Sequence, residues 1–254
     1  MGTRVLILGG TTEARRLAER LAPRRDLDVT LSLAGRTNNP VPHPVPVRIG
    51  GFGGPGGLAD HLKSERIGRL IDATHPYAAQ MSANAAEAAR LAGVPLLALR
   101  RPVWCPVAGD RWTEVADTCA ATRALGEAPR RVFLALGRNE IAAFAAAPQH
   151  HYLVRSVDPV EPPLAVPSAT YIQARGPFRE ADDRALLAAH AIDMVVSKNS
   201  GGDAAYGKIA AARALGIAVI LLRRPALPEV PAVETVDNAV AWLDHGPSSP
   251  ARGV

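Results

Sequence analysis

An internal repeat constrains the fold of this chain more than any other feature of its sequence. Residues 92–102 (AGVPLLALRRP) and 215–225 (LGIAVILLRRP) align without a gap. Each segment reads as the end of a helix, a glycine, a buried strand and an Arg-Arg-Pro exit. An Ala-rich stretch typical of a helix precedes each segment, at 78–91 and at 204–215. The sequence therefore indicates one structural plan that is used twice.

The repeat extends in both directions from these segments. The further matching pieces are 6–9 with 134–137, 70–73 with 194–196, and 112–125 with 233–243. Strands that alternate with helices at this spacing predict parallel sheets that helices cover on both faces. We expect an α/β fold of two Rossmann-like, three-layer, parallel-sheet domains. Convergence of common patterns, rather than duplication, is the alternative explanation of the match.

The domain boundary is predicted in a connection that contains glycine and proline, residues 126–131. This gives a first domain over 1–128 and a second over 129–246. The remaining stretch, 247–254, is rich in Pro, Ser and Gly and is predicted to be a flexible tail.

Composition excludes several classes of protein. With 48% hydrophobic and 21% charged residues, the 254-residue chain is expected to fold, and no apolar run approaches the roughly 20 residues of a membrane helix. No secretory segment precedes the first predicted strand, so we expect a cytoplasmic protein without membrane association. Cys105 and Cys119 form neither a disulfide framework nor a metal knuckle, and the scattered histidines predict no metal site.

The net charge of +5 favours an anionic partner. Nucleic acid is disfavoured as that partner, because the arginines are scattered and only 4% of the residues are aromatic. Arginines on solvated faces are the plain alternative for most individual positions.

A glycine-containing loop directly follows the first predicted strand, 5–8, and opens a helix over 13–21. Glycine permits a tight turn and close backbone approach, and a helix N-terminus attracts a pyrophosphate. The full GxGxxG pattern is absent, so the strand and helix around the loop are the better evidence. A plain turn capped by Thr12 is the alternative. The cofactor-binding residues expected here are Gly9, Gly10, Thr11, Thr12 and Glu13.

The loop after the second predicted strand indicates which dinucleotide would bind. In NAD-binding relatives, a carboxylate about 20 residues past the glycines binds the ribose 2'-hydroxyl. Arg36 and Thr37 stand there instead, and a guanidinium suits the 2'-phosphate of NADP. We therefore expect NADP(H) as the cofactor.

A third loop, 50–57, is dominated by glycine. Such a segment forms either a flexible linker or a loop whose backbone packs closely against a flat ligand, here the nicotinamide ribose. On the second reading, Gly51, Phe52 and Gly53 are cofactor-binding residues.

Polar loops follow the paired strands 70–73 and 194–196. In the first, Thr74 and His75 are expected beside the cofactor, and His75 reads equally as a hydrogen-bonded imidazole at a helix start or as an acid-base group. Tyr77 is a further catalytic candidate.

The second polar loop offers a charge, amide and hydroxyl donors, and an exposed helix start, which together predict an anion cradle. Arg138 adds another cation, in the place that Gly10 occupies in the first half. This asymmetry predicts the cofactor on the first half and an acidic substrate on the second. The substrate-binding residues expected are Arg138, Lys198, Asn199, Ser200, Gly201 and Gly202.

Four motifs, LILGGTTEAR (6–15), DATHPYA (72–78), LGRNE (136–140) and SKNSGG (197–202), resemble the signature segments of the precorrin-6A reductase family. The resemblance covers nearly the whole chain, in order. It implies that hydride from NADPH reduces one double bond of precorrin-6A to give precorrin-6B in cobalamin biosynthesis, at a site between two Rossmann-like domains. It further implies a tetrapyrrole substrate with several carboxylates, and hand-over to neighbouring pathway enzymes is a further expectation.

The motifs leave the proton donor and the exact substrate undecided. The proton donor is His75, Tyr77, Lys198 or a bound water. A cobalt-precorrin-6A reductase of the anaerobic route shares these motifs, and another NADP-dependent reductase of an anionic metabolite fits the same charges. A module that binds NADP or a tetrapyrrole without catalysis is the alternative outside the enzymes.

Overall fold

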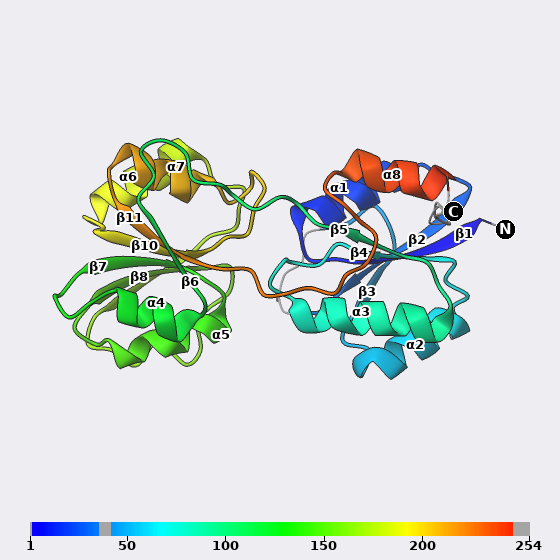
Figure 1. The fold of residues 1–254 in the computed structure, drawn as a ribbon, viewed down its shortest axis with the longest axis horizontal. Helices are drawn as coiled ribbons and strands as arrows, with labels where there is room; N and C mark the ends of the chain where they lie inside the picture. The colour runs from blue at the N-terminus through cyan, green and yellow to red at the C-terminus, as the bar shows by residue number, and fades with distance from the viewer. Residues whose placement is uncertain (1, 36–41, 246–254) are drawn as a thin grey trace, which may run out of the picture. The chain divides into compact units, whose positions relative to one another are not determined.

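The computed structural model of the chain describes residues 2–35 and 42–245, which form two compact α/β units (Figure 1). The first unit contains the described residues of 1–102 and 225–254, and the second unit contains 103–224.

The first unit is built on a six-stranded sheet in which all strands are parallel, in the order β12-β5-β4-β1-β2-β3. Helices α1 and α8 cover one face, and α2 and α3 cover the other (Figure 1). The strands are β1 (Thr3–Leu8), β2 (Leu27–Leu33), β3 (Val47–Ile49), β4 (Arg69–Asp72), β5 (Leu96–Leu99) and β12 (Ala232–Val233). The helices are α1 (Thr12–Leu21), α2 (Gly54–Ser64), α3 (Ala79–Ala92) and α8 (Val236–His245).

Residues 5–8 of the central strand β1 form a continuous apolar run because both faces of the strand are buried. Val5 and Ile7 pack beneath α1 and α8, whereas Leu6 and Leu8 pack beneath α2 and α3. In a parallel strand that is buried on both faces, side chains on each face contact the core, so apolar and polar residues do not alternate along the strand. Each such side chain contributes about 1.5–3 kcal/mol by leaving water.

The second unit repeats this architecture with the strand order β6-β11-β10-β7-β8-β9, again all parallel. Helices α6 and α7 lie on one face, and α4 and α5 lie on the other (Figure 1). The strands are β6 (Trp112–Val115), β7 (Arg131–Ala135), β8 (His151–Ser156), β9 (Ala169–Gln173), β10 (Met194–Lys198) and β11 (Ala218–Leu222). The helices are α4 (Thr118–Ala124), α5 (Arg138–Ile141), the short 3-10 helix η1 (Ala142–Ala146), α6 (Glu180–Ala189) and α7 (Gly207–Ala214).

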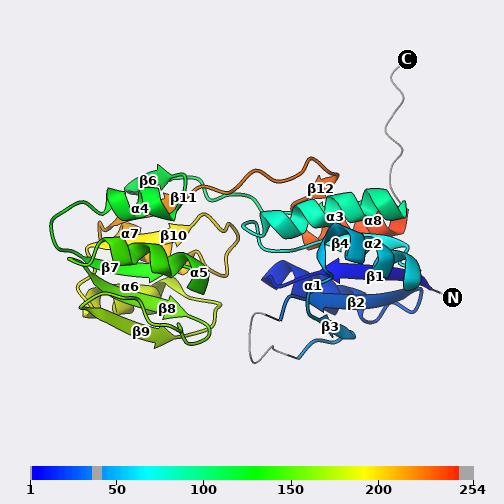
Figure 2. The ribbon, with the colours of Figure 1, turned by 90° about the horizontal axis from the view of Figure 1, so that it is seen from below.

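The predicted α/β class and the doubled parallel-sheet plan are confirmed, but the structure divides the chain differently from the predicted 1–128 and 129–246. Strand β6 and helix α4 follow the first half in sequence, yet β6 pairs with β11 of the second unit. Strand β12 and helix α8 follow the second half, yet β12 pairs with β5 of the first unit. Figure 2 shows this exchange: the orange β12 lies with the blue and cyan strands, and the green β6 lies beside β11.

The exchange has a simple physical reason. Strands β5 and β11 carry the same sequence pattern, so either could accept either edge strand, and only tertiary pairing decides between them. The chain therefore passes from one unit to the other twice, each time within one residue of an Arg-Arg pair, at 102–103 and 224–225. The predicted tail, 247–254, lies outside the described residues.

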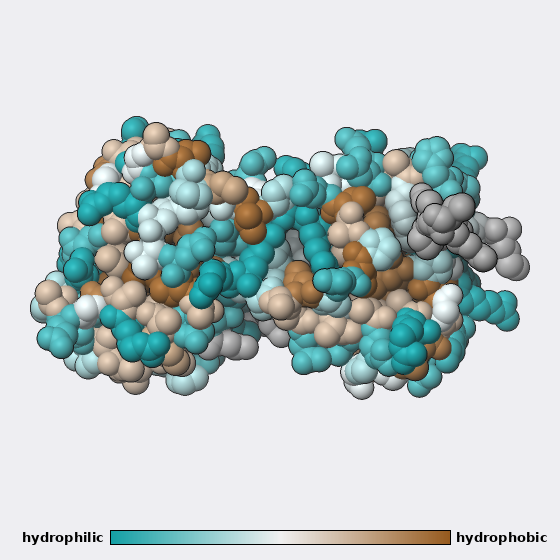
Figure 3. Space-filling model, in the orientation of Figure 1, coloured by the Kyte–Doolittle hydropathy of each residue, from teal (hydrophilic) through white to brown (hydrophobic). Residues whose placement is uncertain are grey.

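None of the described helices is long and apolar enough to cross a membrane. On the face drawn in Figure 3, hydrophobic residues form scattered patches among larger hydrophilic areas.

Candidate functional site

Each sheet has one point at which the direction of its strand order reverses. In the first unit this switch point lies between β1 and β4, and in the second it lies between β7 and β10. Ligands of open parallel sheets bind beyond the carboxyl ends of the strands at such points. The predicted loops that begin at Gly9, Thr74, Gly137 and Lys198 leave the carboxyl ends of these four strands, so the structure places them at the two switch points. The glycine-rich loop 50–57 follows β3, at the edge of the first sheet.

The glycines at the first switch point have separate roles. A Cβ atom on Gly9 would lie 2.6 Å from Leu31 Cδ1, so the buried Leu31 side chain of β2 would have to shift to make room for it. Gly10 has a φ of +110°, which side chains rarely adopt, and the space around it is open. The loop can therefore present its backbone directly to a ligand.

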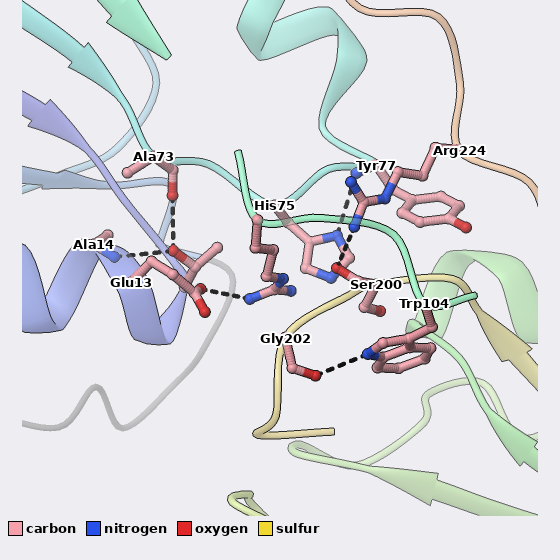
Figure 4. Close-up of polar contacts among 11 residues, drawn as sticks. Glu13, Ala14, Ala73, His75, Tyr77, Trp104, Ser200, Gly202 and Arg224 are labelled. Atoms are coloured by element: carbon pink, nitrogen blue, oxygen red, sulfur yellow. Dashed lines mark hydrogen bonds and ion pairs between the residues drawn. The ribbon is translucent and has the colours of Figure 1, made fainter. Parts of the chain in front are cut away.

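Thr11, rather than Thr12, caps helix α1. Its Oγ1 accepts a hydrogen bond from the N–H of Ala14 at 3.1 Å and donates one to the carbonyl oxygen of Ala73 at 2.8 Å (Figure 4). The second bond ties the loop after β1 to the loop after β4 across the switch point. The backbone N–H groups of Thr12 and Glu13 lie in the first turn, where a helix has no carbonyl partners of its own for them.

The Glu13 side chain is held by an arginine that sequence reasoning left without a role. Arg101 Nη1 lies 2.5 Å from Glu13 Oε2, and the two side chains are only 12% and 16% exposed (Figure 4). A carboxylate at a helix N-terminus would repel an anionic ligand, but this pairing offsets its charge. The first switch point thus remains suited to a phosphate group.

A buried carboxylate fixes the loop after β4. Asp72 accepts hydrogen bonds from the N–H of Thr74 (3.1 Å), from Thr74 Oγ1 (2.6 Å) and from Ser82 Oγ (2.6 Å). Thr74, which we predicted beside the cofactor, therefore uses its hydroxyl to anchor the loop. The bond to Ser82 joins the loop to helix α3.

His75 has a defined orientation within that loop. Its Nδ1 accepts a hydrogen bond from the N–H of Tyr77 at 3.3 Å, and the two rings lie 5.7 Å apart. A ring nitrogen that accepts a hydrogen bond carries no proton, so the proton of the neutral imidazole lies on Nε2. Both side chains are half-buried.

The glycine-rich loop after β3 places its one aromatic residue, Phe52, against the core. The Phe52 ring packs against the core beneath α2, 5.1 Å from the His61 ring and 3.8 Å from the Arg48 guanidinium carbon. Burial, and secondarily the charge of Arg48, lowers the pKa of His61, which favours the neutral imidazole. The Phe52 side chain is thus used for packing, and the backbone of Gly51 and Gly53 is what this loop offers at the sheet edge. The predicted Arg36 and Thr37 lie outside the described residues.

The second switch point is charged where the first is glycine-rich. Lys198 Nζ, at the end of β10, donates to Glu140 Oε1 of α5 at 2.6 Å. The two side chains are 15% and 30% exposed, so the pair is accessible. Arg138, in the same helix, is exposed and forms no ion pair with any residue in the described part of the chain.

Asn199, which we predicted as a substrate-binding residue, makes two hydrogen bonds with the backbone of Trp104. Its side chain is buried, its Oδ1 accepts from the N–H of Trp104 (2.8 Å), and its Nδ2 donates to the carbonyl of Trp104 (3.0 Å). The Trp104 indole N–H in turn donates to the carbonyl of Gly202 at 2.8 Å (Figure 4). The Asn199 amide therefore fastens the loop to the segment before β6.

The rest of the loop is shaped by Arg224 and by two glycines. The Arg224 guanidinium donates to the carbonyls of Asn199 and Ser200, at 2.9 Å in both cases. Gly201 and Gly202 have φ values of +69° and +67°. Helix α7 begins only at Gly207, so the prediction that residues 198–202 lead directly into a helix start is wrong. The loop offers charge and backbone groups, without a helix terminus beside them.

Comparison with known proteins identifies the family. The model of the precorrin-6x reductase family (CbiJ/CobK) matches residues 4–244. The chain belongs to the precorrin-6x reductase family. A precorrin-6A reductase from a Sinorhizobium species is 57% identical over 242 residues, which cover 95% of this chain and 93% of that protein. A cobalt-precorrin-6A reductase from Salmonella typhimurium is 29% identical over 255 residues, which cover 95% and 94%.

A solved structure described as CobK precorrin-6A reductase superposes with a TM-score of 0.92. It is 52% identical to this reductase, and the match covers 99% of this chain and 100% of that one. Membership of this family makes the chain an oxidoreductase.

Sequence reasoning missed four residues that shape the two switch points of this reductase: Asp72, Arg101, Glu140 and Arg224. The sequence repeat could have indicated two of them, because Arg101 and Arg224 are the second arginines of the duplicated Arg-Arg-Pro segments. Each contacts the ligand loop of its own unit, Glu13 in one and residues 199–200 in the other. Among the described residues, no group of His, Cys, Asp and Glu is placed to hold a metal ion.

Proposed function

We propose that this protein reduces precorrin-6A to precorrin-6B with NADPH. The single observation that carries the proposal is the contrast between the two switch points: one offers glycine backbone and a helix N-terminus, and the other offers Lys198 and Arg138. Family membership supplies the reaction class. Incubating the protein with NADPH and precorrin-6A, while following the nicotinamide absorbance, tests the proposal, and an unchanged absorbance would contradict it.

The residues at the first switch point fit a dinucleotide. The close approach at Gly9, the backbone conformation of Gly10 and the amides that open α1 suit a pyrophosphate, and NADPH supplies the hydride when it is bound. Gly51 and Gly53 would lie beside the cofactor through their backbone. Thr74 would act by holding His75 in place.

The residues at the second switch point fit a carboxylated ring. Lys198 and Arg138 would bind acetate or propionate arms, with Ser200, Gly201 and Gly202 contributing backbone groups. The Asn199 amide would act indirectly, because it fixes the loop to Trp104. The substrate carboxylates would compete with Glu140 for Lys198.

The proton donor stays among His75, Tyr77, Lys198 and a bound water. For His75, the bond from the Tyr77 N–H to Nδ1 leaves Nε2 as the atom that carries a proton to donate.

Replacing Arg36 by alanine is expected to raise the KM for NADPH about tenfold or more while changing the KM for NADH less than twofold. NADPH alone carries the 2'-phosphate that the guanidinium would bind. Steady-state kinetics with both coenzymes measures the difference, and equal effects on the two would refute the assignment.

Replacing Lys198 by alanine is expected to raise the KM for precorrin-6A about tenfold without changing the affinity for NADPH. The change removes a cation and also leaves the Glu140 carboxylate unpaired, so the substrate carboxylates are repelled. The control is Glu140→Gln, which keeps an oxygen acceptor for Lys198 but removes the negative charge. That variant should bind precorrin-6A as well as the unmodified protein or better. A loss of similar size in both variants would show that the pair is only structural.

The cobalt-containing substrate is the main alternative. The greater identity to the Sinorhizobium protein than to the Salmonella one supports the metal-free macrocycle. Comparing kcat/KM for the two macrocycles decides between them. The cytoplasmic location and the hand-over of product to a neighbouring enzyme stay predictions.

A further inference from the structure

A cavity of about 550 Å³ opens in the second unit, beside the switch point but apart from Lys198. Helix α5 and η1 form one wall, and residues 160–165 form the other. These segments follow the carboxyl ends of the adjacent strands β7 and β8, so the cavity lies at the ligand-binding edge of the sheet. Its volume falls within the roughly 300–1,000 Å³ of small-molecule sites.

The lining of this cavity is apolar except for two charged residues. Ile141 and Leu164 are buried, and Arg138 and Glu161 are exposed. The other lining residues are Ala142, Ala145, Val160, Pro162, Pro163 and Ala165. An apolar surface beside a cation that pairs with no described carboxylate is complementary to a ligand with an apolar body and a carboxylate arm.

Both walls of the cavity are anchored to the sheet. The N–H of Leu164 donates to the Tyr171 hydroxyl of β9 at 2.7 Å. On the other wall, Phe144 of η1 is fully buried, with its ring 5.9 Å from that of Tyr152 in β8. A cavity whose walls are held in this way exists before the ligand arrives, so little binding energy is lost in ordering it.

We propose that this cavity is a substrate subsite that takes one edge of the macrocycle, with ring alkyl groups against the apolar lining and one carboxylate arm on Arg138. The proposal rests on the proposed function and deepens it. The negative charge of Glu161 repels a substrate carboxylate near the 160–165 wall. The carboxylate arm is therefore directed toward α5.

The test fills the cavity without touching either switch-point loop. Ala145→Trp is expected to raise the KM for precorrin-6A at least about tenfold while leaving the affinity for NADPH unchanged. Ala142→Trp is a second filling variant at a more exposed position, and it should act in the same direction. Ala146→Trp is the matched control, because Ala146 is exposed in the same short helix and does not line the cavity. Its KM should stay within twofold.

Arg138→Gln is expected to raise the KM as well, and Arg138→Lys should restore part of the loss, because it restores the charge without the guanidinium fork. Equal KM values for the filling variants and the control would overturn the subsite. If the unmodified protein does not oxidise NADPH with precorrin-6A, the proposed function fails. The subsite is then decided by titrating precorrin-6A calorimetrically: weaker binding by Ala145→Trp alone supports it, and unchanged binding overturns it.

Discussion

Replacing Asp183 by alanine is expected to lower the free energy of unfolding by about 3–5 kcal/mol, since it leaves a buried guanidinium without a counter-charge. Asp183 of α6 forms an ion pair with Arg155 of β8, and the two side chains are 3% and 6% exposed. The guanidinium carbon also lies 3.7 Å from the centre of the Phe178 ring and 4.9 Å from that of Phe133. Urea unfolding, followed by circular dichroism, measures the change.

A neighbouring surface pair provides the control for this prediction. Asp182 is 62% exposed and pairs with Arg179, itself 83% exposed, at 3.0 Å. Asp182→Ala should cost less than about 1 kcal/mol, because exposed pairs contribute little. The double variant Arg155→Met, Asp183→Leu removes both charges and should recover much of the loss. An Asp183→Ala protein as stable as the Asp182→Ala protein would contradict the account.

Replacing Gly10 by alanine is expected to weaken NADPH binding at least about 100-fold. A side chain at a φ of +110° costs about 1–3 kcal/mol, and the loop can relieve that strain only by moving. Movement would withdraw backbone amides from the phosphates, at about 1.5–3 kcal/mol for each hydrogen bond to a charged group. Isothermal titration calorimetry with NADPH measures the loss.

Gly93→Ala is the matched control for strain alone. Gly93 ends helix α3 with a φ of +66°, and a Cβ atom there would also meet open space. Its replacement should cost stability without changing the affinity for NADPH. If both variants bound NADPH as tightly as the unmodified protein, the loop at Gly10 would have no part in binding.

Much of the fold could be predicted from sequence because it depends on local patterns. The duplicated strand and helix segments, the parallel sheets and the glycine loop before α1 all follow from apolar runs and their spacing. The exchange of β6 and β12 could not be predicted, because β5 and β11 present the same pattern to both edge strands. Only long-range pairing distinguishes the two arrangements.

The candidate site shows the same division between local and long-range information. The glycines and Lys198 could be proposed from sequence because their chemistry is visible in a short motif. The contacts of Glu13 with Arg101 and of Asn199 with Trp104 join residues 88 and 95 positions apart, so no motif could reveal them. The packing of Phe52 could not be predicted, because its partners Arg48 and His61 lie on the flanking elements.

A paired calorimetric titration of NADPH tests the central claim, that the first switch point binds the dinucleotide and the second binds the acidic ring. The account predicts that Gly10→Ala loses most of the NADPH affinity and that Lys198→Ala keeps it. The opposite pattern, with NADPH binding intact in Gly10→Ala and lost in Lys198→Ala, would contradict it.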